Sequence, residues 1–158
     1  MSLLALQVGF LGHLSGRENI ILSAMFMGMS KAEISSKLES VIDFSGLGEF
    51  IDQPVSIYSA GMRARLGFSV ALNVDADVFL IDEVIAVGDA EFQKKAKTAI
   101  REKISQGKTA VIVSHNLNLI QRWCDRVIWL DSGNIIRSGR PSDVISAYQA
   151  QMAYRRRG

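Results

Sequence analysis

The chain has 158 residues, 48% hydrophobic and 22% charged, which predicts a folded chain of at most one ordinary domain, or a piece of a larger one. Its net charge of +2 is too small to indicate nucleic acid or anionic lipid as a partner, and its single cysteine excludes an internal disulfide. The apolar stretches are too short to span a membrane and the N-terminus lacks the positive region of a signal peptide, so we expect a cytosolic chain.

The first helix is predicted from a capping pattern. Residues 1–14 are apolar and indicate a strand end that runs into a loop. Ser15 and Glu18 have the capping-box spacing, which predicts a helix over residues 16–28. The Met-Phe-Met sequence at residues 25–27 is typical of core packing, and we favour that interpretation over a partner-facing surface.

The same pattern recurs at Ser30 and Glu33 and predicts a second helix, which ends near Gly46. A short turn or helix at residues 47–51 follows, and Pro54 and Val55 indicate a loop. The region is therefore helical and contains no strand. It predicts a helical subdomain beside a sheet.

Residues 58–62, Tyr-Ser-Ala-Gly-Met, precede another helical run. A hydroxyl and a glycine at a helix start can form an anion site, because the free N–H groups and the helix dipole point at it. The simpler alternative is a serine N-cap with a glycine beside it.

The apolar run from Val78 to Ile81 ends in Asp82 and Glu83. Such a run predicts a strand that is buried on both faces, and ligands gather at the carboxyl ends of parallel strands. One carboxylate can hold Mg²⁺ while the other orients or deprotonates a water molecule. The alternative is an ordinary strand that runs into an acidic turn.

A second buried strand is predicted at Thr109–Val113, after an amphipathic helix over residues 90–105 with a solvated basic face. This strand ends in Ser-His-Asn, so His115 is expected at the same sheet edge as the two acids, where it could hydrogen-bond a phosphate oxygen. A structural histidine is the alternative.

The last part of the chain predicts a short helix at residues 117–124 and a hairpin of strands 126–131 and 134–138. A final helix begins near Pro141, and the three arginines at residues 155–157 are typical of a solvated tail.

No segment supplies a phosphate-binding loop of the form Gly-x-x-x-x-Gly-Lys-Ser/Thr. Gly107-Lys108-Thr109 resembles its end, but Glu102 stands where the first glycine is needed. That loop also needs a strand leading into a helix, and here a helix leads into a strand.

Four segments in this order resemble the nucleotide-binding subunit of an ABC transporter. Residues 58–62 are similar to the signature motif, 79–83 to Walker B with its catalytic glutamate, 86–89 to the D-loop and 114–115 to the switch histidine segment. The residues found in the signature and D-loop segments, together with residues 13–19, most resemble those of the branch that exports O-antigen, capsule and teichoic acid polysaccharides.

The resemblance covers the whole chain. It implies an α/β fold, part of a P-loop NTPase (RecA-like) parallel sheet with an inserted helical subdomain. Residues 1–14 would end the Q-loop strand region, 15–57 would form the helical subdomain, and 58–158 would form the signature helix and the C-terminal part of the core. A membrane-spanning permease and a second ATP-binding subunit, as a homodimer, would be the partners, at the cytoplasmic face of the inner or plasma membrane and without nucleic acid.

The resemblance also assigns roles around ATP and Mg²⁺. Asp82 would help to hold Mg²⁺, Glu83 would polarise the attacking water, and His115 would contact the γ-phosphate. The signature would contact the γ-phosphate of ATP held by the other subunit, and Asp89 would cross the dimer interface. The residues assigned to the signature are Tyr58, Ser59, Ala60, Gly61 and Met62, and Gln7 is the nearest candidate for the Q-loop glutamine.

Two departures from the family pattern limit the activity we expect. The phosphate-binding loop is missing, and in the signature Ala60 replaces a glycine and Met62 replaces a glutamine. We therefore expect the chain alone neither to bind ATP tightly nor to hydrolyse it. The alternatives are a non-catalytic partner that donates only a signature face to an intact subunit, and a soluble ABC-type ATPase of DNA repair or translation.

Overall fold

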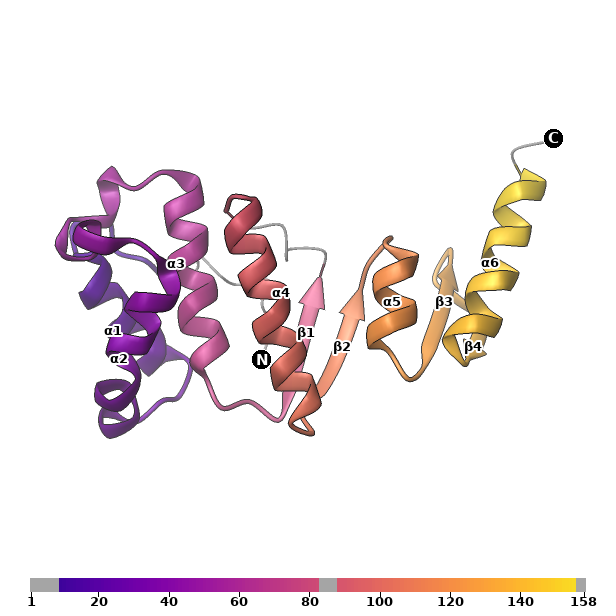
Figure 1. Ribbon diagram of the computed structural model, residues 1–158, viewed down its shortest axis with the longest axis horizontal. Coiled ribbons are helices and arrows are strands. Elements are labelled where there is room, and N and C mark those ends of the chain that lie inside the picture. The colour runs from indigo at the N-terminus through magenta and orange to yellow at the C-terminus, as the bar shows by residue number, and fades with distance from the viewer. Residues whose placement is uncertain (1–8, 83–87, 156–158) are drawn as a thin grey trace. The chain divides into compact units, whose positions relative to one another are not determined.

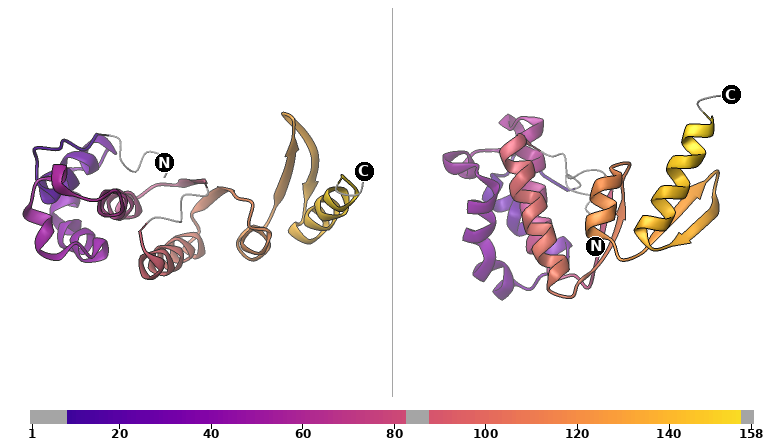
Figure 2. Two further views of the ribbon diagram at one scale, coloured as in Figure 1. Left: turned by 90° about the horizontal axis from the view of Figure 1, so that it is seen from above. Right: turned by 45° about the vertical axis from the view of Figure 1, so that its right-hand side comes forward.

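A computed structural model describes residues 9–82 and 88–155. The chain divides into two compact units, with the boundary between Val111 and Ile112. Helices precede the first strand, helices and strands then alternate as far as β3, and a β3–β4 hairpin precedes the last helix (Figures 1 and 2). No helix within the described ranges is long and apolar enough to cross a membrane. The elements are α1 (Gly16–Phe26), α2 (Lys31–Ser45), η2 (Gly48–Asp52), η3 (Val55–Ile57), α3 (Ala60–Asn73), β1 (Val78–Asp82), α4 (Ala90–Ser105), β2 (Thr109–Val113), α5 (Leu117–Trp123), β3 (Val127–Asp131), β4 (Asn134–Gly139) and α6 (Pro141–Arg155).

Capping boxes begin the first two helices, as predicted. At α1 the Ser15 hydroxyl accepts from the Glu18 N–H at 3.2 Å, and the Glu18 carboxylate accepts from the Ser15 N–H at 2.8 Å. Ser30 and Glu33 repeat the arrangement at α2. Gly46 ends α2 in the left-handed conformation, with φ of 63°, which a glycine adopts without steric cost. Local sequence therefore sets these helix ends.

The capping box of α1 makes its stability depend on pH. Hydrogen bonds from the Ser15 N–H and hydroxyl lower the pKa of Glu18 below its ordinary value of 4.5. A carboxyl whose pKa is lowered on folding adds stability above its unfolded pKa, and this stability is lost as pH falls through the folded pKa.

Glu18→Gln keeps a capping box but removes the titrating group. We expect the urea midpoint of this variant to fall less steeply with pH than that of the natural chain, below pH 4.5. Urea unfolding at a series of pH values between about 3 and 7 measures the slope. Identical slopes for the two proteins would contradict this account of Glu18.

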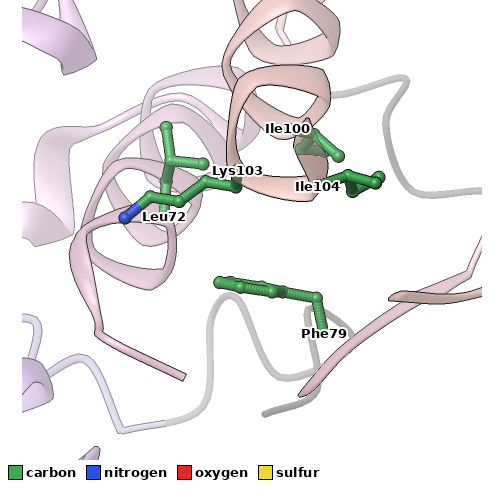
Figure 3. Close-up of a pocket in the computed structure, with 5 residues that line it drawn as sticks. All are labelled: Leu72, Phe79, Ile100, Lys103 and Ile104. Atoms are coloured by element: carbon green, nitrogen blue, oxygen red, sulfur yellow. The ribbon is translucent and has the colours of Figure 1, made fainter. Parts of the chain in front are cut away.

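Strand β1 pairs with β2 and is buried on one face only. The two strands form a two-stranded sheet, and the Thr109 N–H donates to the Asp77 carbonyl at 3.1 Å. Phe79 and Ile81 are buried, and Phe79 points toward α3 and α4 (Figure 3). The alternate residues are exposed: Val78 39%, Leu80 41%, Val111 51% and Val113 62%.

The prediction that both strands are buried on both faces is therefore wrong for the described residues. A continuous apolar run needs a layer on each side of the sheet. Here the helices of the first unit cover the face that carries Phe79, and the opposite side chains remain accessible.

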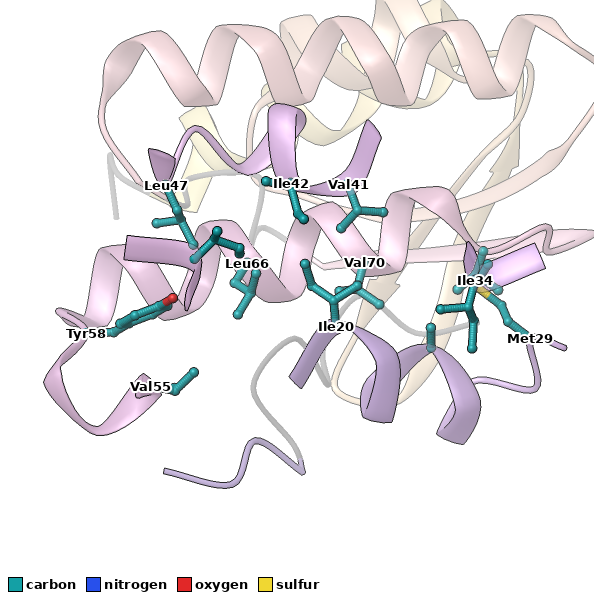
Figure 4. Close-up of a cluster of buried hydrophobic side chains, with 13 residues drawn as sticks. Ile20, Met29, Ile34, Val41, Ile42, Leu47, Val55, Tyr58, Leu66 and Val70 are labelled. Atoms are coloured by element: carbon teal, nitrogen blue, oxygen red, sulfur yellow. The ribbon is translucent and has the colours of Figure 1, made fainter. Parts of the chain in front are cut away.

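The main core of the first unit joins α3 to α1 and α2 (Figure 4). Leu66 and Val70, on α3, are 0% and 1% exposed, so the middle of α3 is fixed against the helical segment. Every residue from Leu66 to Leu72 is buried, so the second half of α3 is covered on all sides. The cluster consists of Ile20, Ala24, Met29, Ile34, Val41, Ile42, Leu47, Ile51, Val55, Tyr58, Leu66, Val70 and Val74.

An aromatic cluster, made of Phe44, Phe68 and Phe92, connects α2, α3 and α4. The ring of Phe68 stacks on that of Phe44 with centroids 6.2 Å apart and meets that of Phe92 edge-on at 5.8 Å. Phe44 and Phe92 meet edge-on at 5.7 Å. Lys95 places its ammonium 4.5 Å from the Phe44 ring centroid and donates to the Phe44 carbonyl at 3.1 Å. A lysine on the expected solvated face of α4 therefore also ties α4 to the end of α2.

The region between α1 and α3 differs from its prediction in two places. Met25 and Phe26 are 48% and 75% exposed, so the core interpretation is wrong for them, and only Met27 packs against the main core. Val55, expected in a loop, begins the one-turn helix η3 and is 2% exposed.

The second unit contains the predicted hairpin and the last helix. Strands β3 and β4 are antiparallel, and Asp131 pairs with Asn134 across a two-residue turn. Both turn residues, Ser132 and Gly133, have positive φ (50° and 79°), as a tight hairpin turn requires. Helix α6 packs on the hairpin, where the Arg155 guanidinium lies 2.7 Å from the Asp131 carboxylate. Arg155 is exposed, as expected of a solvated tail, although it lies in α6 and makes this ion pair.

Candidate functional site

The segment that leads into residues 58–62 is held against the start of α1 by backbone hydrogen bonds. The Val55 N–H donates to the Leu14 carbonyl at 2.9 Å, and the Ser56 N–H donates to the Gly12 carbonyl at 2.9 Å. A third bond, from the Gly16 N–H to the Gln53 carbonyl, measures 3.2 Å. These bonds fix where α3 begins.

Tyr58 anchors this segment with its side chain. It is 3% exposed, and its hydroxyl donates to the Phe50 carbonyl at 2.5 Å. A Cβ added at Gly16 would collide with this hydroxyl and lie 2.9 Å from the Ile51 carbonyl oxygen, so the glycine makes room for the tyrosine. Burial raises the pKa of Tyr58 above its ordinary value. The Tyr58 backbone is engaged as well: its N–H donates to the Val55 carbonyl at 3.0 Å, and its carbonyl accepts from the Arg63 guanidinium at 2.6 Å. Tyr58 therefore positions the start of α3 and is not free to contact a ligand through these groups.

Ser59 caps α3, and its hydroxyl accepts from the Met62 N–H at 3.1 Å. The other N–H groups of the first turn, those of Ala60 and Gly61, point out of the helix start. Ser59 and Ala60 are exposed, and Gly61 is half-buried. This helix start combines a hydroxyl with free N–H groups and can receive an anion.

A side chain at Gly61 would not clash with the described residues. A Cβ built there would meet only the Ser59 hydroxyl, at 3.8 Å, among the described atoms, which is an ordinary contact. Its φ is not positive, so its backbone does not require glycine either. A glycine in a helix costs about 1 kcal/mol relative to alanine, and neither the packing nor the backbone of the described residues requires one here.

Met62 packs partly buried against the main core. Its side chain therefore contributes to the packing of α3, and it offers no polar group to a ligand.

Asp82 is the last residue of β1 and is half-buried. No group of three or more His, Cys, Asp or Glu side chains that could hold a metal gathers in the described part of the chain. A single carboxylate still suits Mg²⁺, which keeps several water ligands and is commonly bound by one or two carboxylates together with substrate phosphates.

Asp89 begins α4 and uses both carboxylate oxygens. Oδ1 accepts from the Phe92 N–H at 2.9 Å, and Oδ2 forms an ion pair with Arg65 on α3. Arg65 was not among the functional residues predicted from the sequence. The available signal was a basic residue on a helix face otherwise filled by buried apolar residues, which needs an acidic partner from another element.

Three of the predicted residues cannot be assembled with the others. Gln7 and Glu83 lie outside the described residues. His115 follows β2 in the second unit, so its expected place beside Asp82 stays a prediction.

A hollow between α3, β1 and α4 is not a nucleotide site. Its volume of about 10 Å³ leaves room for about one water molecule at most, and Lys103 is the only polar residue among the described residues that line it (Figure 3). Its other lining residues are Leu72, Phe79, Ile100 and Ile104.

The comparisons with known proteins agree on the class of protein. Among solved structures, an ATP-binding subunit of an ABC transporter matches 88% of this chain and 58% of its own, with a TM-score of 0.74 and 22% identity. A dimeric ATP-binding cassette in a post-hydrolysis state with ADP and Pi matches 85% and 60%, with a TM-score of 0.64 and 24% identity. The chain therefore has the fold of part of an ABC ATPase cassette.

The relatives found by comparing sequences narrow the class to a kind of exporter. The O-antigen export system ATP-binding protein RfbB of Myxococcus xanthus is 47% identical over 94% of the chain, that of Klebsiella pneumoniae 45% over 96%, and the teichoic acids export ATP-binding protein TagH of Lactococcus lactis 46% over 94%. The chain is a homologue of the ATP-binding proteins of O-antigen and teichoic acid exporters. It spans 34%, 62% and 32% of the length of these relatives. No protein-family model matches it.

Proposed function

We propose that this chain provides the signature side of a composite ATP site in the ATP-binding subunit of a polysaccharide exporter. In this arrangement the start of α3 faces ATP that is bound by a second ATP-binding subunit. The whole assembly would use ATP hydrolysis to move a polysaccharide or lipid-linked glycan across the inner membrane.

The observation that carries the proposal is the open side of Gly61. The helix start at Ser59 offers a hydroxyl and free N–H groups, and no atom of residues 9–82 or 88–155 fills the space that a side chain at Gly61 would occupy. A γ-phosphate fits there, because it brings negative charge to the positive end of the helix and needs close approach to the backbone.

The remaining groups would act at a second composite site, on the nucleotide that the chain's own subunit would hold. Asp82 would hold Mg²⁺ at the end of β1, Glu83 would polarise the attacking water, and His115 would contact the γ-phosphate. Mg²⁺ would supply charge neutralisation at the phosphates when bound. Gln7 is kept as the candidate Q-loop glutamine, and residues 15–57 as the helical subdomain.

The permease is the second proposed partner. Met25 and Phe26 expose apolar surface on α1, within the helical segment that would dock on a membrane-spanning subunit. Docking there would hold the chain at the cytoplasmic face of the membrane.

A non-catalytic role remains the second candidate. Among the 158 residues there is no Gly-x-x-x-x-Gly-Lys-Ser/Thr segment, so the chain would complete a site on an intact partner without holding a nucleotide of its own.

Gly61→Ala separates the ligand role of this glycine from any role in folding. The added Cβ has room inside the chain, so the free energy of unfolding should stay the same or rise by about 0.4–1 kcal/mol. It would occupy the space needed by the phosphate, so ATP turnover of the assembled transporter should fall about tenfold or more, equivalent to about 1.4 kcal/mol. Urea unfolding and a phosphate-release assay measure the two effects.

Gly12→Ala is the matched control. Its added Cβ would lie 3.6 Å from the Ser56 Cβ, also an ordinary contact, and Gly12 is outside the proposed site. We expect this variant to keep both stability and turnover. ATP-dependent association with the partner subunit, measured by light scattering, should weaken for Gly61→Ala alone. Full turnover and association of Gly61→Ala would refute the proposed function.

A further inference from the structure

Both oxygens of the Asp89 carboxylate have a partner in its own chain. One oxygen caps α4 at the Phe92 N–H, 2.9 Å away, and the other forms the ion pair with Arg65. The Asp89 side chain is 58% exposed and that of Arg65 is 23% exposed, so the pair lies at the surface with the arginine mostly covered. A planar guanidinium held in this way fixes the position of the carboxylate better than a mobile surface cation would.

The Arg65 side chain packs closely against Gly88 and Phe92. Its guanidinium lies 5.3 Å from the Phe92 ring centroid. Gly88 has a φ of 72°, and a Cβ built there would lie 3.1 Å from Arg65 Nε, 3.2 Å from Arg65 Cγ and 3.3 Å from Phe92 Cβ. The turn, the arginine and the start of α4 therefore pack together closely enough that a side chain at Gly88 would force one of them to move.

This contact joins two parts of the proposed ATP site. Arg65 is on α3, six residues after Ser59, on the helix whose start would face the nucleotide. Asp89 belongs to the segment expected to cross the subunit interface. Phe92 continues the connection into the aromatic cluster of Phe44, Phe68 and Phe92.

We propose that Arg65 is a positioning residue that ties the Gly88–Asp89 turn to the signature helix, so that both elements meet the partner subunit as one rigid body. This rests on the proposed function. Asp89 then acts through the position of its turn, since its carboxylate is engaged within the chain. Loss of Arg65 frees the turn without touching the nucleotide.

Amide hydrogen exchange, measured in the absence of nucleotide, tests whether Arg65 holds the Gly88–Asp89 turn. In the complete ATP-binding subunit, Arg65→Gln should accelerate exchange at the N–H groups of Phe92 and Gln93 about tenfold, because both bond to Asp89. Asp89→Asn keeps the N-cap but loses the charge, and should give a similar acceleration. Arg17→Gln, which removes another arginine paired with acids, at Glu39 and Asp52, should leave these rates unchanged.

Kinetics of the assembled transporter test the consequence. Arg65→Gln should lower kcat about fivefold with KM for ATP changed less than about twofold, because Arg65 does not contact the nucleotide. The Arg65→Gln/Asp89→Asn double variant should be no worse than the poorer single variant, since both break one interaction. Arg65→Lys should fall between Arg65→Gln and the natural chain.

The outcomes separate this inference from the proposed function. Unchanged exchange at Phe92 in Arg65→Gln, or strictly additive single effects on kcat, would overturn the role of Arg65 while leaving a working ATPase. Absence of ATP turnover in the natural assembly would instead refute the proposed function, and the exchange data would still decide whether the turn is tied to α3.

Discussion

Asn19→Asp is expected to destabilise the first unit by about 3–5 kcal/mol at neutral pH. Asn19 is 0% exposed, and its amide nitrogen donates to three carbonyls: Leu11 at 3.0 Å, Leu14 at 3.2 Å and Ser15 at 2.9 Å. Its oxygen accepts from the Leu11 N–H at 2.8 Å. Aspartate has the same shape but, when ionised, would direct negative charge at three carbonyl oxygens.

The sign of the pH dependence follows from the same contacts. Burial among carbonyls raises the folded pKa of an aspartate at this position, so the loss is greatest above that pKa and shrinks as pH falls and the carboxyl becomes protonated. Urea unfolding at about pH 7 and about pH 4 measures both values.

Asn73→Asp is the graded control, because the Asn73 amide donates to a single carbonyl, that of Ser69 at 2.9 Å. Its loss should be about 1–2 kcal/mol. A loss for Asn19→Asp below that of Asn73→Asp would contradict the view that Asn19 organises the loop at residues 11–15.

Phe68→Ala is expected to cost about 3–5 kcal/mol of the free energy of unfolding. Phe68 is 1% exposed and packs on the rings of both Phe44 and Phe92, so the substitution leaves a cavity and removes two aromatic contacts. The cavity lies where α2, α3 and α4 meet, and the neighbouring rings cannot fill it without moving those helices.

Phe50→Ala applies the same change to a side chain that is 53% exposed. Its cost should stay below about 1 kcal/mol, since little apolar area is buried there and the backbone carbonyl that accepts from Tyr58 is retained. Equal urea midpoints for the two variants would contradict the importance of the aromatic cluster.

Features that depend on neighbours in sequence could be predicted. The two capping boxes join residues three apart, and the hairpin turn uses two residues that tolerate positive φ, so each is determined locally. The fold class and the kind of family also followed from the order of four short motifs, and the comparisons confirm both.

Features that depend on distant neighbours could not be predicted. Burial of β1 was overestimated because an apolar run indicates what a strand can bury, and Val78 and Leu80 lack a covering layer in the described residues. The exposure of Phe26 depends on where α2 and α3 pack against α1. The ion pair of Arg65 with Asp89 joins residues 24 apart in sequence, and neither residue type alone indicates its partner.

ATP turnover in a mixed assembly tests the central claim most directly. The purified chain would be assayed alone, and then with an intact exporter ATP-binding subunit whose own signature serine is replaced by alanine. We predict no turnover by the chain alone, weak turnover by the partner alone, and a gain on mixing that is lost when the chain carries Gly61→Ala. Robust turnover by the chain alone, or no gain on mixing, would contradict the assignment of residues 58–62 as the signature side of a shared ATP site.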